Sequence, residues 1–167
     1  SFAKVERIIL ESIAATDDRV AVHQALLHLV VGGNVLVFMS RKGLKVYPLN
    51  RFVVDRDGNG NVIEIVTKER INKKLIEDKL PADYLQNQKA GDSYGDHDDE
   101  CDVYTHVRRE NNRFVWHQEV YDYKLKGSEG KAPEATNPWI PLRFNTVDGE
   151  SYGRGRVGQF IGDLKSL

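Results

Sequence analysis

The chain has 167 residues and carries 24 Lys and Arg side chains against 25 Asp and Glu, for a formal net charge of −1. This balance excludes the whole-chain basic field that draws a protein to nucleic acid or anionic membranes. The one cysteine, Cys101, excludes an intramolecular disulfide and a Cys-x-x-Cys metal site. No apolar run approaches the roughly 20 residues of a membrane helix, so we expect no membrane partner. The length suits a single domain, which we expect residues 1–167 to form.

Two helices are predicted before residue 32. Residues 2–15 place apolar side chains on one stripe, which is typical of an amphipathic helix. Residues 18–31 follow a Thr-Asp-Asp signal for a helix N-terminus and are apolar around much of the helix, so we expect this second helix to be largely buried. Its histidines, His23 and His28, are five residues apart rather than four. This spacing favours core or surface histidines over a pair that shares a metal ion.

Short strands are predicted next. Residues 35–39 form a continuous apolar run typical of a buried strand, and residues 44–48 predict an edge strand that Pro48 interrupts. Residues 51–55 and 61–67 are rich in β-branched side chains and flank an Asp-Gly-Asn-Gly cluster. That combination predicts a β-hairpin.

The turn of this hairpin partly matches a calcium-binding loop. Asp55, Asp57 and Asn59 stand at the first ligand positions, but Val66 stands where the bidentate glutamate is required. The predicted flanks are strands rather than the helices of an EF-hand. We therefore favour a turn over a calcium site, and expect neither a metal ion nor a cofactor on this chain.

The middle of the chain is polar. Residues 68–87 have apolar side chains at helical spacing, divided by Pro81, and predict a helical connector packed on the sheet. Residues 91–102 are dense in Asp and Glu and predict an acidic mobile loop, with loose cation binding as the alternative. Cys101 lies within this acidic run, where neighbouring carboxylates would raise its pKa and argue against a catalytic thiol.

A second hairpin is predicted from residues 103–109 and 113–123, followed by a polar loop over residues 126–137 and an extended strand over residues 138–144. Aromatic residues alternate there with arginines. Such a combination can stack on nucleic acid, although cross-strand pairs in a half-buried sheet explain the pattern more simply. The predicted fold class is α+β: a mostly antiparallel β-sheet with N-terminal helices packed on it and a truncated C-terminal helix.

The last stretch opens with a glycine motif. Residues 153–158 fit Gly-x-Gly-x-x-Gly, and the apolar spacing from Val157 onward predicts a helix that the end of the chain truncates. A dinucleotide site would need a strand directly before the glycines and a parallel βαβ unit, which the pattern does not provide. Arg154 and Arg156 would oppose the helix dipole unless an acidic partner met them. With Tyr152, they are candidates for contact with a neighbouring subunit.

No Ser-His-Asp set, carboxylate pair on a rigid element or His/Cys cluster emerges from these elements, so the pattern predicts no active site. A resemblance adds to this. The run Gly-Leu-Lys-Val-Tyr-Pro-Leu-Asn-Arg-Phe at residues 43–52, continued through residue 64, resembles the central part of the portal protein, or head-to-tail connector, of short-tailed bacteriophages of the podovirus type. Residues 23–26 before it, and residues 149–155 and 162–167 after it, resemble that family in the same order.

The resemblance implies an internal fragment of a longer portal subunit, from the wing region. A portal is a structural ring of twelve subunits at one vertex of the capsid, with no catalytic residues of its own. Its implied partners are other portal subunits, capsid and scaffold proteins, the terminase that packages the genome, tail adaptor proteins, and double-stranded DNA passing through the ring. Its implied location is the portal vertex of the virion, and the host cytoplasm during assembly.

Two interpretations from other classes remain open. A β-rich virion module that binds another protein or a glycan would share the strand pattern. An enzyme domain is the other, and a nucleotide or metal retained on the purified protein would favour it.

Overall fold

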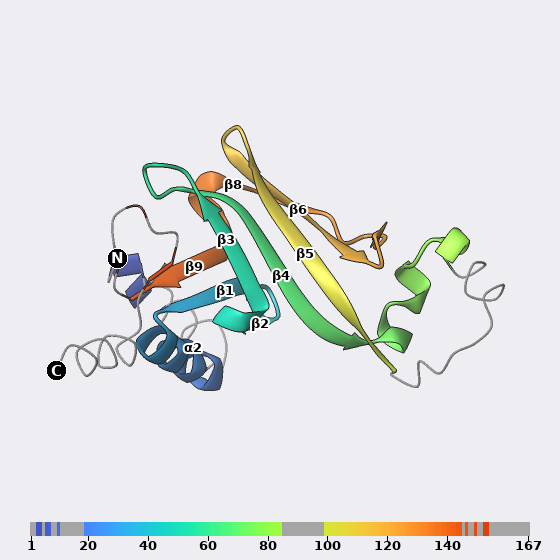
Figure 1. The fold of residues 1–167 in the computed structure, drawn as a ribbon, viewed down its shortest axis with the longest axis horizontal. Coiled ribbons are helices and arrows are strands. Elements are labelled where there is room, and N and C mark those ends of the chain that lie inside the picture. The colour runs from blue at the N-terminus through green and yellow to red at the C-terminus, as the bar shows by residue number, and fades with distance from the viewer. Residues whose placement is uncertain are drawn as a thin grey trace.

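The computed structural model describes residues 3, 4, 6, 7, 10, 19–84, 99–144, 146, 149, 152 and 153 (Figure 1). The elements of seven or more residues are α2 (Arg19–Gly32), β1 (Asn34–Ser40), β4 (Val62–Asn72), β5 (Glu100–Glu110) and β6 (Arg113–Val120). The shorter strands are β2 (Gly43–Pro48), β3 (Phe52–Arg56), β7 (Tyr123–Lys124), β8 (Gly130–Pro133) and β9 (Trp139–Arg143). Single-turn 3-10 helices are η1 (Leu49–Arg51), η2 (Lys73–Leu75), η3 (Glu77–Lys79) and η4 (Glu134–Thr136).

The strands form two sheets. Sheet A has three strands in the order β2-β1-β9, and sheet B has the order β3-β4-β5-β6-β7 with β8 also paired to β6. Every described pairing is antiparallel. The predicted α+β class with a mostly antiparallel sheet is confirmed. The predicted C-terminal helix, and most of the predicted first helix, lie outside the described residues.

The fold is a stack of three layers, with sheet A between α2 and sheet B. Successive side chains of a strand point to opposite faces of the sheet, so β1 can pack against α2 on one face and against sheet B on the other. Val35 and Val37 pack with Ala25 and Leu29 of α2, whereas Leu36 points the other way. Leu36 joins a core built with Tyr47 and Trp139 of sheet A and with the following residues of sheet B: Phe52, Val54, Ile65, Val107 and Phe114.

A separate core lies beneath the far end of sheet B. Strands β4 and β5 each have 11 residues and run beyond the part that sheet A covers (Figure 1). There the segment after β4 folds back as η2 and η3. Its side chains Ile76 and Leu80 pack on those of sheet B and the adjoining loop: Cys101, Val103, Val120 and Leu125. The described chain thus has a central stack and a smaller cluster, joined by strands β4, β5 and β6 of sheet B.

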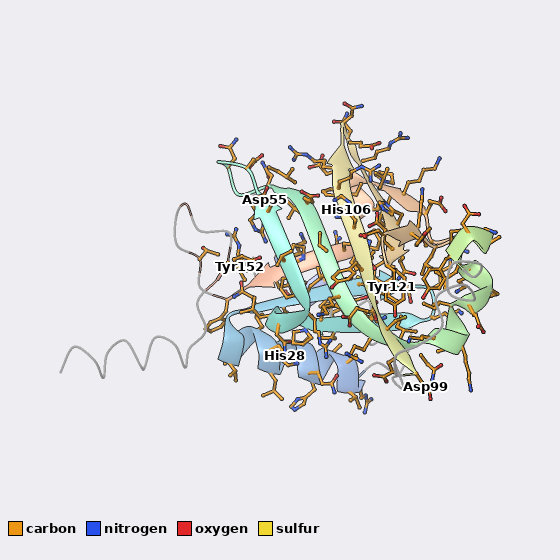
Figure 2. The ribbon with its side chains drawn as sticks, turned by 45° about the vertical axis from the view of Figure 1, so that its right-hand side comes forward. His28, Asp55, Asp99, His106, Tyr121 and Tyr152 are labelled. Carbon is orange, nitrogen blue, oxygen red and sulfur yellow. The ribbon has the colours of Figure 1, made fainter. Side chains whose placement is uncertain are left out.

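The prediction that the second helix is largely buried is wrong. α2 spans Arg19–Gly32, close to the predicted bounds, but only Val22, Ala25 and Leu29 are buried. One sheet can cover only one side of a helix, and sheet A covers that side. The apolar residues on the other side are exposed. His23 and His28 are exposed residues of α2; His28 is labelled in Figure 2.

Two further predictions are wrong for one shared reason. Residues 68–72 were predicted as helix and residues 100–102 as loop, but both belong to strands: residues 68–72 at the end of β4 pair with residues 100–104 at the start of β5. Basic and acidic side chains alternate on these ends and meet diagonally, Lys68 with Asp102 at 3.5 Å and Arg70 with Glu100 at 3.2 Å. Opposite charges on neighbouring strands stabilise the pairing. Residues 91–98 of the predicted acidic loop lie outside the described residues.

The predicted loop over residues 126–137 contains a strand. β8 adds to the edge of β6, where Gly130 pairs with Trp116. A Cβ on residue 130 would lie 2.1 Å from the Trp116 indole, so the absence of a side chain allows this contact. The predicted hairpins β3–β4 and β5–β6, and the strands β1, β2 and β9, are confirmed.

Candidate functional site

Tyr152, one of the three predicted subunit-contact residues, makes a contact within its own chain. Its phenol oxygen accepts a hydrogen bond from the backbone N–H of Val54 over 2.9 Å, and its ring packs against the central core. Val54 lies on β3, the outer strand of sheet B, whose free backbone groups could otherwise pair with another chain. Tyr152 therefore covers part of this strand edge. The predicted contact of Tyr152 with another subunit stays a prediction.

The residue after Tyr152 is held firmly. Gly153 N–H donates to Asn34 Oδ1 over 2.6 Å, and Asn34 Nδ2 donates to Gly153 O over 2.7 Å. A Cβ on residue 153 would lie 2.5 Å from the carbonyl oxygen of Gly33, so only glycine fits here without a shift. The start of the predicted glycine-rich helix entry is thus fixed against the beginning of sheet A. Arg154 and Arg156 lie outside the described residues.

Basic side chains converge beside the β3–β4 turn. Arg56 donates from Nη1 to Gly60 O over 3.0 Å, and Arg143 reaches the same glycine from β9. Burial, and then the nearby charge of Arg143, lower the pKa of Arg56 to about 10, against an opposing effect of Tyr152. Burial, and then the charges of Arg56 and Arg7, lower the pKa of Lys4. The sequence did not predict this cluster, because its members are far apart in the chain.

The Asp-Gly-Asn-Gly turn uses its aspartate to close the hairpin. Asp57 Oδ1 accepts from the backbone N–H groups of Asn59 and Asn61, each over 2.9 Å, and Oδ2 accepts from the side chain of Asn61. These hydrogen bonds lower the pKa of Asp57. Among the residues that the structure describes, no group of three or more His, Cys, Asp or Glu side chains is placed to hold a metal ion.

The arginines of the β5–β6 hairpin face carboxylates of the same chain. Arg108 contacts Glu110 over 3.1 Å, and Arg109 lies 3.8 Å from Asp57 and 3.7 Å from Glu134. Such exposed pairs contribute little to stability, but they neutralise the local charge. This arrangement fits the half-buried sheet rather than a surface for stacking nucleic acid.

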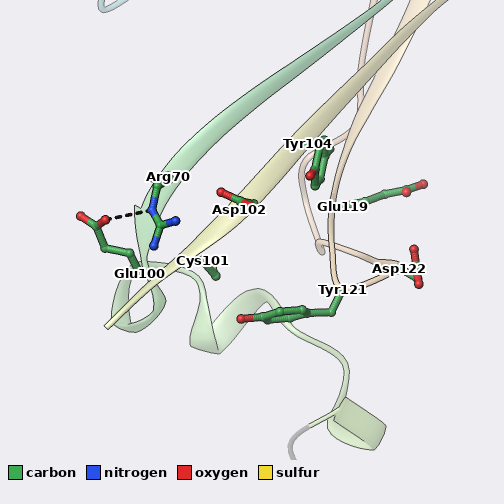
Figure 3. Close-up of a pocket in the computed structure, with 8 residues that line it drawn as sticks. All are labelled: Arg70, Glu100, Cys101, Asp102, Tyr104, Glu119, Tyr121 and Asp122. Carbon is green, nitrogen blue, oxygen red and sulfur yellow. Dashed lines mark hydrogen bonds and ion pairs between the residues drawn. The ribbon is translucent and has the colours of Figure 1, made fainter. Parts of the chain in front are cut away.

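A hollow of about 350 Å³ lies where β5 begins and β6 ends (Figure 3). The hollow is lined by four carboxylates, one guanidinium, two tyrosines and one cysteine. The lining residues are Arg70, Glu100, Cys101, Asp102, Tyr104, Glu119, Tyr121 and Asp122. The Cys101 side chain is buried, and burial is the main reason that its pKa is raised, with Asp102 adding to the effect. Such a thiol is a poor nucleophile.

No helix among the described residues is long and apolar enough to cross a membrane. The described residues thus form a layered stack to which Tyr152 and Gly153 are hydrogen-bonded. A basic cluster lies at one hairpin turn, and an acidic hollow lies at the far end of sheet B.

Comparison with known proteins identifies the family to which the chain belongs. A family model described as "Bacteriophage head to tail connecting protein" matches residues 1–167. The chain belongs to this family of phage head-to-tail connecting proteins. The resemblance seen in the sequence is confirmed.

Individual relatives carry a more specific name. The chain is 36% identical to the portal protein of Escherichia phage T7 and 36% identical to the portal protein of Enterobacteria phage T3, in each case over 98% of this chain and 31% of the relative. It is 28% identical to the portal protein of Pseudomonas phage phiKMV, over 100% of this chain and 33% of the relative. The chain thus spans about a third of the length of these relatives.

Proposed function

We propose that this chain is part of a structural subunit of a phage portal, the head-to-tail connector ring at one vertex of the capsid. The match of the family model along the whole chain is the observation that carries the proposal. The ring forms the channel for packaging and ejection of double-stranded DNA, and the platform to which terminase and tail attach. The chain does this as architecture and not as an enzyme.

The arrangement of the described residues supports this role. Two side chains that the sequence offered for chemistry have structural positions: Asp57 closes a turn, and Cys101 is buried. A ring that closes by rotation needs a rigid subunit with two different faces, because each subunit meets the next head to tail. The three-layer stack offers such a body, with a helix on one outer side and a sheet on the other.

The finer parts of the proposal follow the family resemblance. Residues 1–167 form one domain of the longer subunit, in the wing region of a twelve-membered ring. Capsid, scaffold and tail adaptor proteins are its other partners, and the subunit is found at the portal vertex of the virion and in the host cytoplasm during assembly. Tyr152, Arg154 and Arg156 contact the neighbouring subunit, where the two arginines meet carboxylates.

Electron microscopy of the purified full-length protein tests the proposal. We expect closed rings with twelvefold symmetry and an axial channel. A full-length protein that stays monomeric across the concentrations used for assembly would overturn it. Substituting Arg154 and Arg156 by glutamate in the same protein tests the finer assignment, since the ring should then lose stability in proportion to the salt bridges that are broken.

A further inference from the structure

α2 presents a second apolar face, on the side that sheet A leaves uncovered. Val20, Leu27 and Val31 are 71%, 51% and 51% exposed, and their spacing of seven and four residues places them on one stripe of the helix. Leu26 and Val30 extend the stripe toward its buried side. A contiguous apolar patch of this kind on a protein surface marks a place where another surface binds.

α2 carries no negatively charged side chain. The helix contains no Asp or Glu, and its exposed polar side chains include Arg19, His23 and His28. A partner surface would therefore combine apolar or aromatic groups with negative charge. A surface with both aromatic groups and negative charge is present on the same chain.

The acidic hollow meets this requirement and lies on sheet B, the layer farthest from α2. Cys101 and Val103 of β5 point into the core, so the alternate residues Asp102 and Tyr104 face outward. Tyr104 and Tyr121 are partly exposed aromatic groups at this hollow, and one side of the Tyr121 ring stacks on Tyr84. The carboxylates of the hollow are Glu100, Asp102, Glu119 and Asp122 (Figure 3).

Arg70 pairs with Glu100 over 3.2 Å and Lys68 with Asp102 over 3.5 Å, and His117 contacts Glu119 over 2.6 Å. The four carboxylates still exceed the two charged cations, Arg70 and Lys68, so the hollow keeps a negative character. Two complementary surfaces thus lie on α2 and at the far end of sheet B.

We propose that α2 of one subunit docks at the Tyr104–Tyr121 hollow, at the far end of sheet B, in a second copy of this chain. The apolar stripe of α2 covers the tyrosines, and its basic side chains approach the carboxylates. This inference rests on the proposed portal ring, because a head-to-tail ring requires two different faces of the subunit to meet. It adds to that proposal the particular pair of surfaces.

Charge placed on the α2 stripe tests the docking. In the full-length protein, Leu27→Asp and Val31→Asp are expected to weaken subunit association by about tenfold or more, since a charge would be buried in the contact. Sedimentation velocity measures the ring fraction, and electron microscopy shows whether the rings are closed. Leu75→Asp is the matched control: Leu75 is 67% exposed on η2 and lies outside both surfaces, so its rings should form as in the wild type.

A crosslinking experiment tests the partner directly and does not depend on a destabilising charge. Leu27→Cys and Tyr121→Cys are combined in one full-length chain in which Cys101, a free thiol in the lining of the hollow, is replaced by alanine. The protein is treated with a short bismaleimide, which joins two accessible thiols. We expect a ladder of covalent oligomers on a denaturing gel, and none from either single variant. The pair Leu27→Cys with Leu75→Cys is the control and should give no ladder.

The outcomes separate the two proposals. If the Leu27→Asp and Val31→Asp variants form rings as the wild type does, and the Leu27–Tyr121 cysteine pair gives no crosslink, the docking is overturned and the portal assignment stays intact. A crosslink confined to a band of monomer size would also overturn it, because α2 would then be covered within its own subunit. Absence of rings in the wild type would instead overturn the portal assignment.

Discussion

Asn34 and Gly153 are 119 residues apart in the chain and exchange two hydrogen bonds, of 2.6 and 2.7 Å, between the amide side chain of one and the backbone of the other. Asn34 begins β1, the central strand of sheet A, and is 3% exposed. Its side chain therefore does for Gly153 what a neighbouring strand would do. This contact fixes Gly153 against the beginning of sheet A.

Replacing Asn34 by alanine should destabilise the protein by about 2 kcal/mol or more, because the buried backbone N–H and C=O of Gly153 would lose their partners. Chemical denaturation measures the free energy of unfolding. Asn59→Ala, at an exposed position of the β3–β4 turn, is the control and should change stability by less than about 0.5 kcal/mol. Equal effects of the two substitutions would contradict the role assigned to Asn34.

Gly153→Ala tests the same contact from the other side. The new Cβ would lie 2.5 Å from the Gly33 carbonyl oxygen and 2.9 Å from the Cβ of Arg143, so backbone must shift. We expect a loss of about 1–3 kcal/mol, as for other overpacked sites. Gly32→Ala is the matched control, since nothing lies within 4 Å of a Cβ at that position. Thermal denaturation of the two variants should give clearly different midpoints.

Tyr47 should make stability depend on pH in the alkaline range. Burial, then the charge of Glu69 and the hydrogen bond to its carboxylate, raise the pKa of Tyr47 above its ordinary value of 10.0. The folded chain thus keeps a proton that the unfolded chain releases. The resulting stabilisation is complete below pH 10 and is lost as the pH rises through the higher pKa of the folded state.

Tyr47→Phe removes this dependence along with the hydrogen bond. At neutral pH it should cost about 1 kcal/mol, and above pH 10 the difference from the wild type should shrink. Urea denaturation at a series of pH values measures both effects. Tyr104→Phe, at an exposed tyrosine, should keep the wild-type decline; a decline that Tyr47→Phe leaves unchanged would argue against Tyr47 as its source.

Leu36 is the residue through which β1 joins the two sheets. It is fully buried between Trp139, Tyr47 and the inner side chains of sheet B. Leu36→Ala should cost about 2–5 kcal/mol because it leaves a cavity in this core. Leu49→Ala on η1, where the side chain is exposed, is the control and should cost far less. The two free energies of unfolding come from the same denaturant series.

The elements that the sequence predicts well are those defined by near neighbours. The β3–β4 hairpin follows from glycines and Asp57 between two β-branched runs, and all of its turn hydrogen bonds are local. The end of β4 is different. Ile71, Leu75 and Ile76 satisfy a helical spacing, and the outcome was decided by pairing with β5, about 30 residues away. A single-sequence pattern holds no information about that partner.

The site shows the same limit. Tyr152 was identified as a contact residue, but its hydrogen bond to Val54 spans 98 residues and could not be read from spacing. The convergence of Arg56 and Arg143 at Gly60 also depends on how sheet A lies on sheet B. The exposed apolar stripe of α2 was visible in the sequence as excess hydrophobicity. Because the sequence does not give the position of sheet A, the prediction placed this stripe in the core.

Among the described residues, the cluster around Ile76 and Leu80 is connected to the central stack through strands β4, β5 and β6 of sheet B. Segments joined in this way open as separate cooperative units. Amide hydrogen exchange should therefore be faster at Ile76 and Lys126, whose N–H groups bond to Lys73 and Lys79, than at Leu36 in sheet A. Under mild denaturing conditions we therefore expect this end of sheet B to open before the layered stack loses its contacts.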